Sequence, residues 1–167
     1  MKDNPIPKGK MAAAKGFANE NRLLAALLER GYNASRVDLP HSTYDIVVEK
    51  STHDIIRIQV KTVGKSGSIP FTGGIRGGID REYKSKVKEY TQNTKTSDIV
   101  VGVESIRDNG EKEINFYFIP TLYIEEINQK SISIRKIPQT KNNWEILLSC
   151  KNKKFIDKIF SSSKAKS

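Results

Sequence analysis

The chain of 167 residues has few of the cysteine and histidine side chains that form disulfides and structural metal sites in small folds. It has one cysteine, Cys150, and two histidines, His41 and His53. This excludes an internal disulfide, every metal site built from several cysteines, and a histidine-rich metal centre. No apolar run has membrane-spanning length, and the N-terminus lacks the apolar core of a signal peptide. We therefore expect a cytoplasmic protein without a membrane partner.

Acidic residues are scarce relative to basic ones. The chain has 29 Lys and Arg residues against 19 Asp and Glu residues, which gives a formal net charge of +10. Such an excess in a small protein predicts a polyanionic partner, with nucleic acid first and an anionic membrane surface second. The length suits one domain that buries enough surface to fold without staples. Composition alone names no activity.

The chain divides into an arm, a domain and a tail. Residues 1–10 predict a basic N-terminal arm, residues 11–160 a single domain, and residues 161–167 a disordered tail. Residue patterns predict helices at residues 11–30, 80–92, 121–128 and 151–160. They predict strands at residues 35–39, 44–49, 55–63, 98–104, 114–119, 132–137 and 144–148. This order predicts the α/β fold class, with a central mixed sheet flanked by helices.

The first predicted helix carries an acid on its apolar side. At about 100° per residue, Glu20 lies within the arc that Phe17, Leu24 and Leu27 define. An ionised carboxylate directed into a core is costly unless a cation meets it. Two interpretations stay open for the helix alone: a Glu at the edge of the stripe that pairs with a basic neighbour, or a carboxylate held inward for chemistry.

The strand predicted at residues 55–63 carries a second unusual pattern. Apolar and polar residues alternate along it, which directs Gln59 and Lys61 together to the face opposite the core. Asp45 lies near the start of the preceding strand, residues 44–49. An acid, an amide and an amine therefore converge at one edge of the predicted sheet. A solvated polar face explains any one of these residues, but it explains their combination less well.

Glu20, the Tyr44-Asp45 pair and the Gln59-Val60-Lys61 run together resemble the PD-(D/E)xK nuclease superfamily. Its members carry a helix acid, a strand Asp and a (D/E)-x-K run on the next strand of a restriction-endonuclease-like core. Their order, α-β-β-β-α-β, matches the elements predicted between residues 11 and 104. Tyr44 stands where the motif has Pro, and Gln59 replaces the second acid. Similar Gln variants occur among restriction enzymes and in a bacterial intron-encoded homing endonuclease.

The resemblance implies hydrolysis of phosphodiester bonds with Mg²⁺ as the cofactor. Asp45, the side-chain oxygen of Gln59 and the carbonyl of Val60 would bind the ion, which prefers oxygen ligands and few carboxylates. Lys61 would orient or help deprotonate the attacking water and offset phosphate charge. Glu20 would accept a hydrogen bond from a metal-bound water or bind a second ion.

Basic side chains follow the third predicted strand. A glycine-rich loop, residues 64–79, contains Lys65 and Arg76, and glycines let a backbone approach a ligand closely. The helix predicted after it carries further basic residues, Arg81, Lys84, Lys86 and Lys88. We expect these residues to contact DNA phosphates. A flexible surface connection and a solvated helix face are the alternatives.

The sequence therefore predicts a Mg²⁺-dependent, site-specific endonuclease of the homing or restriction type that acts on double-stranded DNA. One site cuts one strand, so we expect a homodimer or homotetramer. Two alternatives stay open: a Holliday-junction resolvase, and a non-catalytic DNA-binding protein with a decayed nuclease site, which Gln59 permits.

Overall fold

A computed structural model of the chain describes residues 7–39, 41–74 and 89–164. The first helix and the strands of the central sheet are α1 (Lys8–Glu29), β1 (Asn33–Arg36), β2 (Ile46–Ser51), β3 (Asp54–Thr62), β7 (Ile99–Asp108) and β8 (Glu111–Pro120). Three short strands lie between β3 and β7, namely β4 (Ser68–Pro70), β5 (Thr72–Gly73) and β6 (Tyr90–Thr91). The elements after β8 are α2 (Thr121–Ile127), β9 (Ser131–Ser133), the 3₁₀ turns Ile134–Lys136 and Pro138–Thr140, α3 (Glu145–Leu148) and α4 (Lys153–Lys164).

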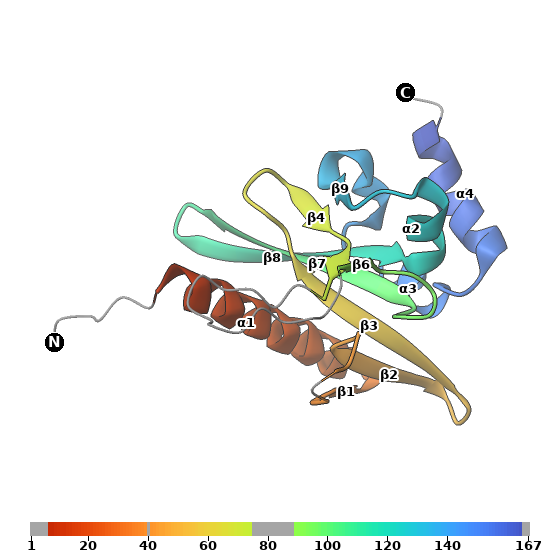
Figure 1. Cartoon of the computed structure of the whole chain (residues 1–167), viewed down its shortest axis with the longest axis horizontal. Helices are drawn as coiled ribbons and strands as arrows, with labels where there is room; N and C mark the ends of the chain where they lie inside the picture. The colour runs from red at the N-terminus through yellow and green to blue at the C-terminus, as the bar shows by residue number, and fades with distance from the viewer. Residues whose placement is uncertain (1–6, 40, 75–88, 165–167) are drawn as a thin grey trace, which may run out of the picture.

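The centre of the molecule is a five-stranded sheet with the order β1-β2-β3-β7-β8. Strands β1, β2 and β3 form an antiparallel meander, β3 and β7 pair in parallel, and β7 and β8 pair antiparallel. The sheet is therefore mixed and helices flank it, which confirms the predicted fold class (Figure 1). Parallel neighbours require a long crossover, and the short strands β4, β5 and β6 lie within that crossover.

The two faces of the sheet carry two apolar cores. Helix α1 lies along one face through its buried Leu23 and Leu27, and α3 adds Ile146 to the same cluster (Figure 1). Helices α2 and α4 pack on the other face, where Ile124 and Phe160 contact a second cluster. Burial on both faces explains why β7 reads as an almost continuous apolar run. No helix in the described ranges is long and apolar enough to cross a membrane.

Several predicted boundaries are wrong. Residues 144–148, expected as a strand, contain the short helix α3, and residues 132–137 leave β9 after Ser133 to form a 3₁₀ turn. The end of the helix expected at residues 80–92 is instead β6, which pairs with β5, and the Gln92 N–H donates to the carbonyl of Phe71; residues 80–88 lie outside the described residues. Helix α1 begins within the predicted arm, and α4 runs to Lys164 within the predicted tail.

The register of β3 and β7 places Lys61 opposite Gly102. A Cβ atom on Gly102 would lie 2.5 Å from Cδ1 of Ile69, a fully buried side chain that fixes β4 on the sheet. This close approach is therefore open only to glycine at position 102. It brings the crossover down onto the sheet beside Lys61.

We expect Gly102→Ala to destabilise the protein by about 1–3 kcal/mol, because the added methyl group overpacks the contact with Ile69. Urea unfolding followed by circular dichroism measures the change. The control is Gly16→Ala in α1, where a Cβ meets nothing within 4 Å, and we expect it to stabilise the protein by up to about 1 kcal/mol. Equal stability of Gly102→Ala and the wild type would contradict the packing described here.

Candidate active site

Asp45 lies immediately before β2, between the neighbouring strands β1 and β3. Its N–H donates to the carbonyl of Ile58 at 2.8 Å, and its own carbonyl accepts from the N–H of Val37 at 2.8 Å. Its carboxylate faces β3, where Oδ2 accepts from the Val60 N–H at 2.7 Å and from Gln59 Nε2 at 2.5 Å. The structure thus brings together the Asp and the Gln-x-Lys strand of the predicted motif.

Burial dominates the electrostatics of Asp45. Desolvation raises the pKa of this carboxyl above its ordinary value. The hydrogen bond from Val60, the charges of Lys61 and Arg36, and the hydrogen bond from Gln59 all oppose the rise without cancelling it. The folded protein therefore holds a carboxylate in surroundings that disfavour its charge, and added positive charge nearby would stabilise it.

Lys61 points from β3 to the same side of the sheet as Gln59. Its Nζ donates to the carbonyl of Thr72 in β5 at 2.8 Å, which fixes the amine at the crossover. Burial lowers the pKa of Lys61, while the charge of Asp45 opposes this shift. The amine is therefore anchored, partly desolvated and within electrostatic reach of Asp45.

Glu20 lies at the edge of the buried stripe of α1. The predicted arc was centred wrongly, because Phe17 is 52% exposed whereas Leu23 and Leu27 are fully buried. The Glu20 side chain is 25% exposed, and its Oε2 lies 3.8 Å from Nε of Arg36. The basic neighbour expected for an edge position is therefore present.

Glu20 nevertheless belongs to the same electrostatic group as Asp45. Burial raises the pKa of Glu20 first, the negative charge of Asp45 raises it further, and Arg36 lowers it. The neighbouring Asn19 ties this turn of α1 to the end of β3, since its Nδ2 donates to Oγ1 of Thr62 at 2.8 Å. The two carboxylates are thus held near enough to repel each other.

The basic residues expected to contact DNA are only partly described. Lys65 is exposed in the turn before β4. Arg76, Arg81, Lys84, Lys86 and Lys88 lie outside the described residues. The first part of the expected glycine-rich loop is ordered structure, because β4 pairs with β9, β5 pairs with β6, and Ile69 and Phe71 are fully buried.

The oxygen atoms around Asp45 suit a hard divalent cation. Within the described ranges no group of three or more His, Cys, Asp and Glu side chains gathers. A cation here would therefore depend on the carboxylates of Asp45 and Glu20 together with neutral oxygens. Nε2 of Gln59 lies 2.5 Å from Oδ2 of Asp45 and 3.2 Å from the carbonyl of Val60, so a positively polarised group already bridges two of the expected ligands. Few carboxylates and several neutral oxygens fit Mg²⁺.

Sequence reasoning missed three residues of this site. Gln92 is 1% exposed and donates from Nε2 to Oε1 of Gln59 at 3.2 Å, although the sequence placed it at the end of a charged helix. Thr72 accepts a hydrogen bond from Lys61 through its backbone carbonyl. Every residue type has this carbonyl, so the sequence gives no sign of the contact. Arg36 pairs with Glu20, and the acid at the edge of the helix signalled a basic partner without identifying it.

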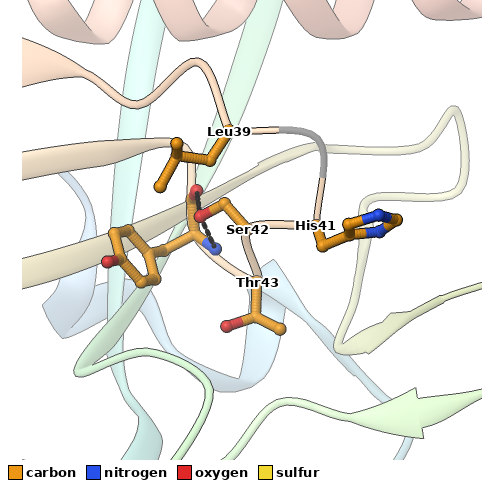
Figure 2. Close-up of a pocket in the computed structure, with 5 residues that line it drawn as sticks. Leu39, His41, Ser42 and Thr43 are labelled. Carbon is orange, nitrogen blue, oxygen red and sulfur yellow. Dashed lines mark hydrogen bonds between the residues drawn. The ribbon is translucent and has the colours of Figure 1, made fainter.

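An open pocket of about 440 Å³ lies on the segment that leads into Asp45 (Figure 2). Leu39, His41, Ser42, Thr43 and Tyr44 line it. The Ser42 hydroxyl donates to the Tyr44 carbonyl at 2.6 Å, and the Thr43 hydroxyl donates to the carbonyl of Thr96 at 2.6 Å. These bonds fix the segment, while Leu39 and His41 stay exposed beside the site.

No protein-family model and no curated protein matches this chain. Its fold is similar to the solved structure of a bacterial homing endonuclease, with 17% sequence identity, coverage of 75% of this chain and 77% of that chain, and a TM-score of 0.48.

We expect Asp45→Asn to raise the denaturation midpoint at neutral pH in the presence of a chelator. Because the pKa of Asp45 is raised on folding, its favourable contribution is present at low pH and is lost as pH rises through that pKa. The amide variant cannot ionise and keeps an oxygen for the Val60 N–H. Urea unfolding at several pH values measures the difference, which should shrink as pH falls.

The matched control is Asp98→Asn. Asp98 accepts from the backbone N–H of Arg57 at 2.8 Å and from its guanidinium Nε at 3.1 Å. Losing the charge there weakens a charged pair, so we expect destabilisation of about 2 kcal/mol. A loss of stability in Asp45→Asn equal to that of Asp98→Asn would contradict the interpretation of Asp45 as a strained, functional carboxylate.

Proposed function

We propose that this chain is a Mg²⁺-dependent endonuclease of the PD-(D/E)xK type that cuts double-stranded DNA at specific sites. The observation that carries the proposal is the placement of Asp45 against β3. Its Oδ2 accepts hydrogen bonds from Val60 and Gln59, while the amine of Lys61 is anchored within electrostatic reach of the same carboxylate. Glu20 supplies a second carboxyl group, whose pKa the negative charge of Asp45 raises.

Asp45, Glu20 and the Val60 carbonyl would hold the ion, and Gln59 would join them by turning its amide oxygen inward. Bound there, the ion would neutralise phosphate charge and make a water nucleophilic. In the described structure the hydrogen bonds that reach the Asp45 carboxylate end on Oδ2, so Oδ1 keeps its lone pairs for a ligand. The donor set therefore needs no histidine.

Lys61 would act at the attacking water. Burial lowers the pKa of its amine, and this enlarges the fraction of Lys61 in the neutral form, whose Nζ can take a proton from water. One N–H of the ammonium form is directed at the Thr72 carbonyl, so the remaining donors are free to meet a phosphate oxygen. The contact with β5 thus orients the group without using all its hydrogen-bonding capacity.

Two features favour DNA as the substrate. The net charge of +10 attracts a polyanion, and Lys65 is exposed on the crossover whose strand β5 anchors Lys61. The exposed Leu39 and His41 lie on the segment before Asp45, where they would face a bound duplex.

Two copies of the chain would be required to cut both strands, which agrees with a homodimer or homotetramer.

The proposal is tested by incubating the full chain with plasmid and genomic DNA in the presence of Mg²⁺. We expect cutting that a chelator abolishes, and a loss of rate of roughly 100-fold or more in Asp45→Ala and in Lys61→Met, since each variant removes a group that acts on the reacting atoms. Gel electrophoresis of the products measures the rates.

Two controls match these changes. Asp54→Asn neutralises an acid at the far end of β3 that pairs with Lys151, and Lys158→Met removes an exposed lysine of α4. Both should cut at the wild-type rate. Cutting that survives Asp45→Ala and Lys61→Met would refute the site. Cutting of four-way junctions but not of linear duplex would identify a junction resolvase instead, and binding without cutting across many DNAs would identify a non-catalytic DNA-binding protein.

A further inference from the structure

The polar side chains next to Asp45 form a chain of hydrogen bonds with one polarity. The Val60 carbonyl and Asp45 Oδ2 can only accept, so the Gln59 atom that meets both must be its amide nitrogen. The amide oxygen of Gln59 therefore faces Gln92, which must present its own nitrogen there, at 3.2 Å. The direction of each amide follows from the acceptors at one end of the chain.

The other end of the chain fixes the same direction. Nε2 of Gln92 also reaches the carbonyl of Thr43 at 3.4 Å, and that carbonyl can only accept. Oε1 of Gln92 accepts from the hydroxyls of Thr96 at 2.7 Å and Ser97 at 2.9 Å. Since Gln92 is 1% exposed, no solvent replaces these bonds if its amide turns.

The loop that carries these partners is itself anchored to the sheet. The guanidinium of Arg57 donates to the carbonyls of Thr94 and Lys95, and the hydroxyl of Thr121 donates to the carbonyl of Ser97. Gln92 is therefore held by a rigid frame, and its amide direction is a fixed property of the fold.

Binding of a cation through Gln59 opposes this direction. To ligate an ion beside Asp45 and Val60, Gln59 must turn its oxygen inward, which aims its NH₂ group at the NH₂ group of Gln92. Two donors then face each other in a buried site, and one hydrogen bond is lost. Gln92 cannot turn in response without setting its oxygen against the Thr43 carbonyl.

We propose that Gln92 is a positioning residue that holds the Gln59 amide nitrogen on Asp45 and thereby restrains Gln59 from becoming a metal ligand. This inference rests on the proposed function for the presence of the metal site, and it adds a residue that sets the affinity of that site. Gln59 is a hydrogen-bond donor to Asp45 in the metal-free protein. It becomes a ligand only when the bond from Gln92 is broken.

The test is Gln92→Met, which keeps the side-chain length and removes both donors. Titration calorimetry with Mn²⁺, without DNA, should show binding tightened by roughly 3- to 10-fold, because turning Gln59 no longer breaks a hydrogen bond with residue 92. In a Gln59→Glu background the same Gln92→Met change should not tighten binding, since a carboxylate presents an oxygen to the ion in either orientation.

Two further variants keep the test decisive. Ser97→Ala removes one hydroxyl that fixes Gln92 and should tighten Mn²⁺ binding in the same direction by about 2-fold, even if Gln92→Met folds poorly. Asn115→Leu removes a buried amide that lies on β8, two strands away from β3, and should leave the affinity unchanged. In NMR spectra of the metal-free wild type, the Gln59 side-chain NH₂ should show a nuclear Overhauser effect to the Val60 amide proton, and Mg²⁺ should abolish it.

The possible outcomes are distinct. Mn²⁺ binding by the wild type with no tightening in Gln92→Met and Ser97→Ala overturns the role of Gln92 and leaves the proposed nuclease intact. Tightening that persists in the Gln59→Glu background also overturns it, because the effect would not pass through the Gln59 amide. Absence of Mn²⁺ binding in the wild type and in Gln59→Glu removes the metal site, and with it both proposals.

Discussion

The structure of the site depends on how the protein compensates the buried charge of Asp45. The carboxylate of Asp45, at the start of β2, loses hydration on folding, and this loss is the largest cause of its raised pKa. The N–H of Val60 and the amide of Gln59 donate two hydrogen bonds to the carboxylate. The positive charges of Lys61 and Arg36 offset part of its negative charge. The remaining deficit is what would attract a divalent cation. Glu20 adds to this deficit, because burial raises its pKa and the negative charge of Asp45 raises it further.

The parallel pairing of β3 and β7 determines what surrounds that charge. A parallel neighbour cannot be reached by a tight turn, so the chain must leave the sheet after Thr62 and return at Ile99. On the way it delivers the Thr72 carbonyl to Lys61 and the Gln92 amide to Gln59. The crossover is thus required by topology and is also the source of the groups that orient the motif.

The alternating strand at β3 is one prediction that the structure retains. Alternation along β3 placed Gln59 and Lys61 on one face, and their burial pattern confirms the register. The α/β class was predictable because β2, β3, β7 and β8 each carry an apolar signal, whereas β1 (NASR) carries none and lies two residues before its expected start. Glu20, Asp45, Gln59 and Lys61 were found by residue type and order along the chain.

The remaining parts could not be predicted for a physical reason. The apolar arc of α1 was misplaced because Phe17 is apolar yet half exposed, where it lies under the guanidinium of Arg36 at 4.3 Å. Residues 144–148 were expected as a strand, but Trp144 packs against Phe118 and the residues after it form the helical turn α3. The roles of Thr72 and Gln92 arise from contacts across the crossover, and no local pattern encodes such contacts.

The amide at position 59 has a physical rationale in the metal-free protein. A carboxylate there would place a second negative charge against Oδ2 of Asp45 and the carbonyl of Val60, with no donor of its own to offer either acceptor. The Gln59 amide replaces that repulsion with two hydrogen bonds, and Gln92 completes the arrangement. The protein thereby gains an ordered site before any cation binds, and in exchange it gives up one negative charge that would strengthen the hold on the ion. A site built in this way would favour order of the empty fold over affinity for a metal ion.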